Sequence, residues 1–77
     1  MPKIPPLSPE KLIKILQKAG FRTIRQKGSH VILMNDKRTR IVIPVHPGRE
    51  VKPGLVRAII KEAGMTREEF IKLLKET

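Results

Sequence analysis

Residues 21–45, FRTIRQKGSHVILMNDKRTRIVIPV, decide the fold of this chain because they contain three β-like runs separated by turn signals. The runs span residues 21–26, 30–34 and 40–45. Gly28 interrupts the chain after the first run, and Asn-Asp-Lys-Arg at 35–38 follows the second. Sequential runs joined by turns this short predict a three-stranded antiparallel meander. Pro44 cannot donate a ladder hydrogen bond, which predicts an edge strand or a strand end there.

A helix is predicted before the strands. Its start signals are Ser8 as the N-cap and Pro9 at the first helical position, and Gly20 follows its last turn. Its apolar stripe consists of Leu12, Ile13, Ile15, Leu16 and Ala19. Together these signals predict a helix of about three turns.

Two further helices are predicted after the strands. The first begins after Lys52 and ends at Gly64, and its apolar face comprises Leu55, Val56, Ile59, Ile60 and Ala63. Lys52 is a poor N-cap, so the first-turn amides are available to an anion. The second begins with a capping box of Thr66 and Glu69 and runs to about Lys75. The order of helix, three strands, helix and short helix is an α+β arrangement.

The composition limits what the chain can be. Its 77 residues predict a single domain over 1–77, because so short a chain must use nearly all its apolar residues for one core. It has no cysteine, and its two histidines lie outside any zinc-like cluster, so we expect no metal and no other cofactor. Residues 1–7 lack the apolar segment of a signal peptide, which predicts a cytoplasmic protein.

The net charge of +10 indicates an anionic partner: nucleic acid, anionic lipid or an acidic protein. No predicted helix combines a basic face with Trp or several Phe residues, which disfavours a membrane surface. Phe21 and Phe70, the only aromatic residues, fall at predicted core positions. Without aromatic side chains for bases to stack on, RNA is expected to bind through its phosphates.

Gly28-Ser29-His30 places a titratable imidazole at the start of a strand. Gly28 suits a turn that needs a positive φ, and Ser29 either contacts a phosphate or satisfies the turn backbone. Histidine suits acid–base chemistry because its ordinary pKa lies near neutrality. RNA is cut without a metal when a base takes the 2′-hydroxyl proton, the oxygen attacks phosphorus, and an acid protonates the departing 5′-oxygen.

Three cations are the candidates for phosphate binding. Arg25 and Lys27 precede the turn, and Lys52 lies at the open end of the second helix. Such cations stabilise the extra charge of the transition state. His46 is a weaker candidate, because flanking prolines suit a loop, although the sheet could bring it close enough to act as the acid.

The chain resembles the HicA family of toxins from bacterial and archaeal toxin–antitoxin pairs. The segments that carry the resemblance are Leu7-Ser8, Lys18-Ala19-Gly20-Phe21, Gly28-Ser29-His30, Ile43-Pro44-Val45-His46, Lys52-Pro53-Gly54-Leu55 and Ile59-Ile60-Lys61-Glu62-Ala63-Gly64. The resemblance implies a fold like the double-stranded-RNA-binding domain, α-β-β-β-α plus a short C-terminal helix, with the helices on one face of a three-stranded antiparallel sheet.

The resemblance also implies a function, a catalytic residue and a partner. Family members cut messenger RNA without the ribosome, and the catalytic histidine falls on His30. An acidic HicB antitoxin holds them inactive by covering the histidine-bearing surface. Many members carry a second histidine directly after the first, where this chain has Val31, so the mechanism implied here uses His30 alone.

Two other classes of function fit the same residues. One is a non-catalytic module that binds double-stranded RNA, and the other is an interaction protein whose basic surface meets an acidic partner. Loss of RNA cleavage on replacing His30, with RNA binding kept, separates the enzyme from both. The sequence leaves open whether copies of the chain form a homo-oligomer.

Overall fold

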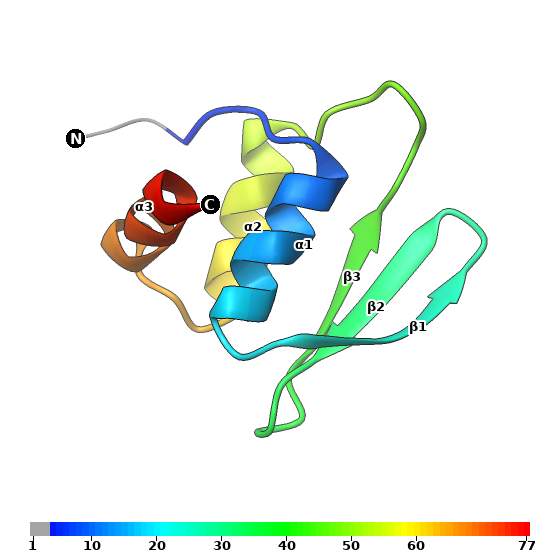
Figure 1. The fold of residues 1–77 in the computed structure, drawn as a ribbon, viewed down its shortest axis with the longest axis horizontal. Helices are drawn as coiled ribbons and strands as arrows, with labels where there is room; N and C mark the ends of the chain where they lie inside the picture. The colour runs from blue at the N-terminus through cyan, green and yellow to red at the C-terminus, as the bar shows by residue number, and fades with distance from the viewer. Residues whose placement is uncertain (1–3) are drawn as a thin grey trace.

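A computed structural model describes residues 4–77. The prediction made from residues 1–7 lies partly outside the described residues, because it includes residues 1–3. The elements are α1 (Pro9–Lys18), β1 (Arg22–Lys27), β2 (His30–Met34), β3 (Arg40–Pro44), α2 (Pro53–Glu62) and α3 (Arg67–Glu76), as Figure 1 shows. The strands form one antiparallel sheet in the order β1-β2-β3. The predicted α+β fold is therefore confirmed. Within residues 4–77, no helix has the length and apolar character needed to cross a membrane.

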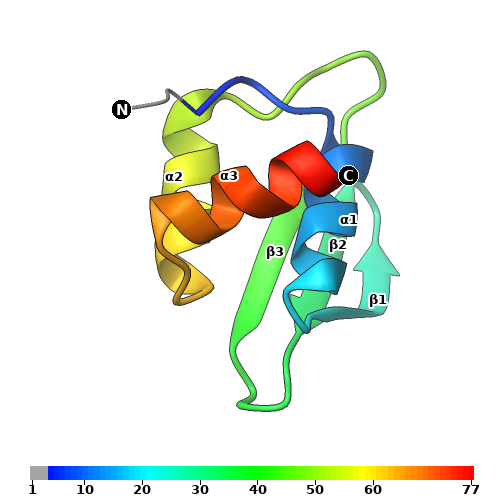
Figure 2. The same cartoon turned by 60° about the vertical axis from the view of Figure 1, so that its left-hand side comes forward.

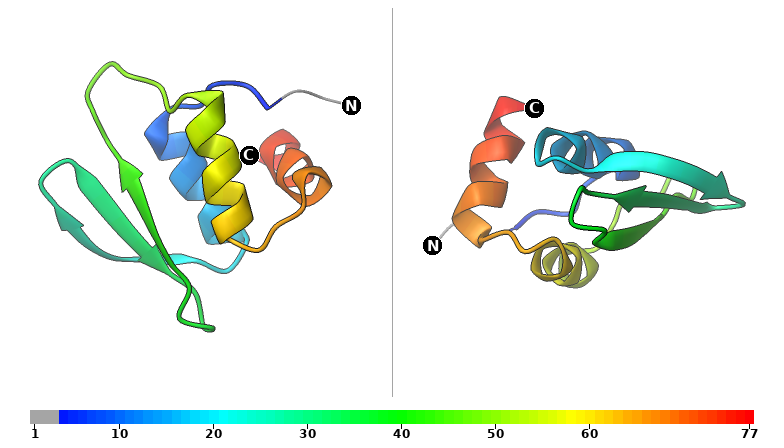
Figure 3. Two further views of the ribbon diagram at one scale, coloured as in Figure 1. Left: turned by 180° about the vertical axis from the view of Figure 1, so that it is seen from behind. Right: turned by 90° about the horizontal axis from the view of Figure 1, so that it is seen from below.

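The helices cover one face of the sheet. Figures 1 and 2 show α1 and α2 between the sheet and α3, and Figure 3 shows the same layers from behind and from below. Along β2 and β3 every second side chain is buried beneath the helices, namely Val31, Leu33, Ile41 and Ile43. They form one core with Phe21, Phe70 and the buried residues of the three helices. The prediction that both phenylalanines lie in the core is confirmed.

The helix starts follow their local signals. The Ser8 hydroxyl accepts a hydrogen bond from the Lys11 backbone N–H at 3.2 Å. The capping box is complete, because the Thr66 hydroxyl accepts from the Glu69 N–H at 3.1 Å and the Glu69 carboxylate accepts from the Thr66 N–H at 2.9 Å. The hydrogen bond from the Thr66 backbone, with a smaller effect from its side chain, lowers the pKa of Glu69. Lys52 gives α2 no side-chain cap, as expected.

Leu55 departs from the predicted apolar face of α2. Its side chain is 41% exposed, whereas Val56, Ile59 and Ile60 are buried. At about 100° per residue, Leu55 lies at the margin of the stripe that these three residues form. It also belongs to the first turn of α2, so the core covers the stripe without reaching Leu55.

Candidate functional site

The side of the sheet that carries no helix is called the open face here. Residues directly opposite each other in neighbouring strands project from the same face, which assigns each strand's contribution. The open face comprises Arg22, Arg25 and Lys27 of β1, His30, Ile32 and Met34 of β2, and Arg40, Val42 and Pro44 of β3. It holds four cations and no carboxylate of its own. Its middle is apolar, with Val42 45% exposed.

His30 is exposed at the first position of β2, the central strand. Lys27 lies directly opposite it on β1, and Pro44 lies directly opposite it on β3. Arg25 occupies the next row of the open face, opposite Ile32. The structure therefore brings three of the sequence-predicted site residues, Arg25, Lys27 and His30, onto one surface.

A two-residue turn of Gly28 and Ser29 joins β1 to β2. Gly28 has a φ of +58°, the positive angle that the first position of a type II′ hairpin turn requires. A Cβ at Gly28 would meet no atom within 4 Å, so the demand for glycine there is conformational. The Ser29 carbonyl accepts a hydrogen bond from the Val45 N–H at 2.6 Å. His30 is thus held between a tight turn and the end of the β2–β3 ladder.

Pro44 fits beside His30 without loss of a ladder bond. Because Ser29 and Val45 are hydrogen-bonded across the sheet, the next pair, His30 and Pro44, falls at a non-hydrogen-bonded position. The nitrogen of Pro44 then faces the outer edge of β3. Residues in such a pair have the closer of the two cross-strand spacings, so Pro44 is the nearest neighbour of His30 on β3. The prediction of an edge strand or a strand end at Pro44 is confirmed, because β3 is an edge strand and Pro44 is its last residue.

A β-bulge in β1 decides which cations share this face. Thr23 is opposite Leu33 and Arg25 is opposite Ile32, so Ile24 is an extra residue without a partner. Strict alternation would place Arg22 on the face opposite to Arg25 and Lys27. With the bulge, all three cations lie on the open face. The sequence pattern alone does not single out Arg22, although the uneven spacing of the three cations is a hint of a bulge.

Arg22 is already engaged, though weakly. Its guanidinium lies 3.6 Å from the Asp36 carboxylate in the β2–β3 turn, and the two side chains are 73% and 92% exposed. An ion pair this exposed contributes little, because water screens it. An anionic ligand can therefore displace Asp36 from Arg22 at small cost.

The remaining candidates lie elsewhere. Lys52 is at the start of α2, within the helical layer that packs on the other face of the sheet (Figure 1). His46 lies two residues beyond Pro44, in a turn where the Arg49 N–H donates to the His46 carbonyl at 3.1 Å. The structure does not place Lys52 on the open face, and it leaves His46 in the loop just past β3.

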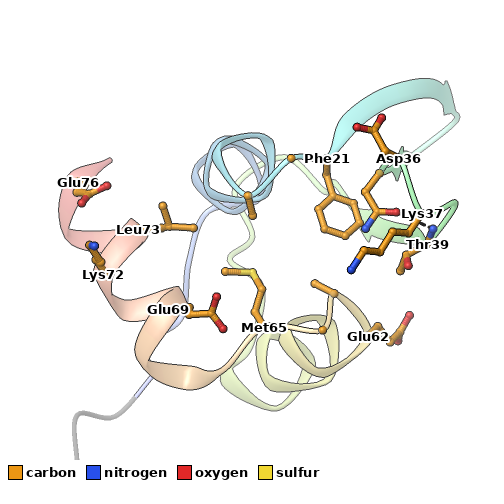
Figure 4. Close-up of a pocket in the computed structure, with 15 residues that line it drawn as sticks. Phe21, Asp36, Lys37, Thr39, Glu62, Met65, Glu69, Lys72, Leu73 and Glu76 are labelled. Atoms are coloured by element: carbon orange, nitrogen blue, oxygen red, sulfur yellow. Dashed lines mark hydrogen bonds between the residues drawn. The ribbon is translucent and has the colours of Figure 1, made fainter.

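A cleft of about 680 Å³ lies where the ends of α1 and α2 meet α3 and the β2–β3 turn (Figure 4). Phe21, Met65 and Leu73 give it apolar walls. Its charged lining residues are Asp36, Lys37, Glu62, Glu69, Lys72 and Glu76. None of the candidate site residues lines this cleft, and its surplus of carboxylates repels phosphate. The open face is the better surface for a polyanion.

Within residues 4–77, no group of three or more His, Asp or Glu residues is placed to hold a metal ion. Comparison with known proteins assigns the chain to a family. No curated protein matches the chain. A family model described as "HicA toxin of bacterial toxin-antitoxin" matches residues 9–65, which include the whole sheet, α1, α2 and every candidate residue. With most of its length matched, the chain belongs to the HicA family of bacterial toxins, a membership that implies a HicB-type antitoxin as its partner.

Proposed function

We propose that this HicA-family toxin is a metal-independent endoribonuclease that cuts messenger RNA in the cytoplasm, with His30 as its catalytic residue. The observation that carries the proposal is the setting of His30: an exposed imidazole, paired across the strands with Lys27, on an open face whose own residues include four cations and no carboxylate. Phosphates are drawn to such a surface, and an imidazole there has direct access to them.

The reaction needs one base, one acid and a source of positive charge. His30 removes the 2′-hydroxyl proton, and the 2′-oxygen attacks the adjacent phosphorus. The bond to the 5′-oxygen breaks as that oxygen receives a proton from His46 or from water, which leaves a 2′,3′-cyclic phosphate and a 5′-hydroxyl. Lys27 and Arg25 stabilise the additional negative charge on the phosphorus centre. His46 is the chain's other imidazole, and replacing it tests whether it supplies the acid.

A mechanism with one imidazole on this strand is consistent with the position of Val31. Successive residues of a strand point to opposite faces. Val31 is 6% exposed and lies opposite Ile43 in the core, whereas His30 is on the open face. A second histidine at position 31 would therefore point away from the phosphate, and the chemistry proposed here does not need it.

The HicB-type partner is proposed to cover His30. The apolar middle of the open face, Ile32, Met34 and Val42, suits a protein surface, and its cations suit an acidic one. Inhibition is then steric. Titrating the antitoxin into a complex of RNA with the His30→Ala protein is expected to displace the RNA; a ternary complex that keeps its RNA would contradict occlusion.

The test of the activity is cleavage in the presence of EDTA. The purified protein is expected to cut messenger RNA and to leave cyclic-phosphate and 5′-hydroxyl ends, and the His30→Ala variant is expected to bind RNA without cutting it. Activity that disappears with chelator and returns with magnesium would contradict the mechanism. A wild-type protein that binds RNA but never cuts it is a non-catalytic RNA-binding module, and one that binds no RNA is a basic interaction protein.

A further inference from the structure

We propose that the substrate lies on the open face as a single strand, with its backbone along β1 and its phosphates on Arg22, Arg25 and Lys27. This inference rests on the proposed function and adds the form and the path of the RNA. β1 is an edge of the sheet, on the opposite side from β3 (Figure 1). The bulge at Ile24 aligns the three cations along that edge.

The spacing of these cations suits a nucleotide chain. A strand rises about 3.3 Å per residue, so Arg25 and Lys27 are about 7 Å apart along β1. A stacked single strand advances about 3.4 Å per phosphate, and an unstacked strand advances farther. Arginine and lysine side chains placed this way can therefore contact phosphates along one backbone. Lys27, opposite His30, marks the end where the bond is cut.

The layout of the open face favours an unpaired strand over a duplex. A duplex presents two phosphate backbones on either side of a groove, and its base faces are buried in the stack. Here three cations lie along β1, while β3 contributes only Arg40 to the open face. Ile32 and Met34 of β2 lie between these two strands, and Val42 lies beside Ile32 on β3; the three side chains can cover the base faces of a single strand. These side chains offer almost no hydrogen-bonding atoms, so little base preference is expected.

Arg22 acts at a distance from the cut. It shares its row with Met34 and Arg40, at the end of the sheet opposite to the row of His30. The two rows are four positions apart along β2, which corresponds to about 13 Å. That distance is about four stacked nucleotides. Arg22 is therefore a positioning residue that only longer RNA can reach, where a phosphate replaces Asp36 as its partner.

The experiment measures RNA binding in the His30→Ala background, where cleavage cannot deplete the RNA. The probes are a 12-nucleotide oligouridylate and the same strand annealed to oligoadenylate. The single strand is expected to bind at least tenfold more tightly than the duplex. Arg22→Gln is expected to lower the log–log salt slope for the single strand by about 0.7, the value for one lost phosphate contact. A uridine trinucleotide competitor should bind equally with and without the Arg22 change.

The matched control is Lys14→Gln, which removes an exposed cation from α1 in the helical layer and should leave the slope unchanged. Equal or tighter duplex binding, or an equal loss from Lys14→Gln, would overturn the path along β1. Because these variants lack His30, a failure of the RNA path is separable from a failure of the proposed activity, which is read from cleavage by the wild-type protein. Binding of an acidic protein but of neither RNA would also overturn this inference.

Discussion

The two faces of the sheet are made by the same strands, but they differ in burial and in the kinds of side chain that they present. On β2, Val31 and Leu33 are buried under the helices, whereas His30, the first residue of the same strand, is exposed. The core face is wholly apolar on β2 and β3, and the open face combines apolar side chains with cations and an imidazole. The two-residue period of a strand thus separates the residues of the core from those of the proposed site. Substitutions on β2 should therefore lower either RNA cleavage or the free energy of unfolding, depending on which face the residue occupies.

The largest effect is expected from His30→Ala. Removing a general base typically lowers the rate by about 10² to 10⁴-fold. Because the His30 side chain is exposed, the melting temperature should stay close to that of the wild type. RNA cleavage assays and thermal unfolding measure the two quantities on one preparation. A fully active variant, or one that melts far below the wild type, would contradict the assignment, and His46→Ala should reduce the rate much less.

Three positions along β2, Leu33→Ala should show the opposite behaviour. Leu33 is fully buried, and truncating a buried leucine costs about 2 to 5 kcal/mol of unfolding free energy. For a domain of this size, each kcal/mol corresponds to about 4 to 8 °C in melting temperature. Below its own melting transition, the variant should keep its cleavage rate per folded molecule. Denaturant unfolding followed by an activity assay checks both, and a stable but inactive variant would break the separation of the faces.

Much of the fold could be predicted because it depends on local chemistry. Ser8 and Thr66 cap helices in the way their side chains favour, and Gly28 supplies the backbone angle that a two-residue hairpin needs. Pro44 marks the end of β3, because proline has no N–H to donate. Each of these signals is read from a few neighbouring residues, and each holds in the structure.

The arrangement of the site was less accessible from the sequence. That Arg22 shares a face with His30 depends on the bulge at Ile24, which exists only in the pairing of β1 with β2. The exposure of Leu55 depends on which side of α2 meets the core. Lys52 shows the same limit, because its place in the helical layer follows from how α2 packs. Which of these residues lie close together depends on how the strands and helices pack, and this packing cannot be predicted from a few neighbouring residues of the sequence.

A moderate effect is expected from Val42→Asp. Val42 is 45% exposed on the open face, so the change should cost little stability. A carboxylate there repels RNA and an acidic antitoxin, and we expect about tenfold weaker binding of each, or about 1.4 kcal/mol. The matched control is Leu55→Asp, at a leucine that is 41% exposed on α2. Equal losses of binding from both variants would mean that the open face is not the interface.

The smallest effect is expected from Thr66→Ala at the N-cap of α3, away from both faces of the sheet. Loss of an N-cap hydroxyl costs about 1 kcal/mol of unfolding free energy, with no change in RNA cleavage.

The two hydrogen bonds from Thr66 lower the pKa of Glu69 from its ordinary value of 4.5. A carboxyl with a lowered pKa in the folded protein contributes stability above that ordinary value, and the contribution is lost as the pH falls through the folded pKa. Alanine at position 66 keeps the backbone N–H, so the variant loses only the smaller, side-chain part of the effect on the Glu69 pKa. The stability difference between wild type and variant should therefore be full at pH 7 and should shrink only slightly below about pH 4. Urea unfolding across this pH range measures the difference, and a difference that grows as the pH falls would contradict a stabilising hydrogen bond from the Thr66 side chain to the Glu69 carboxylate.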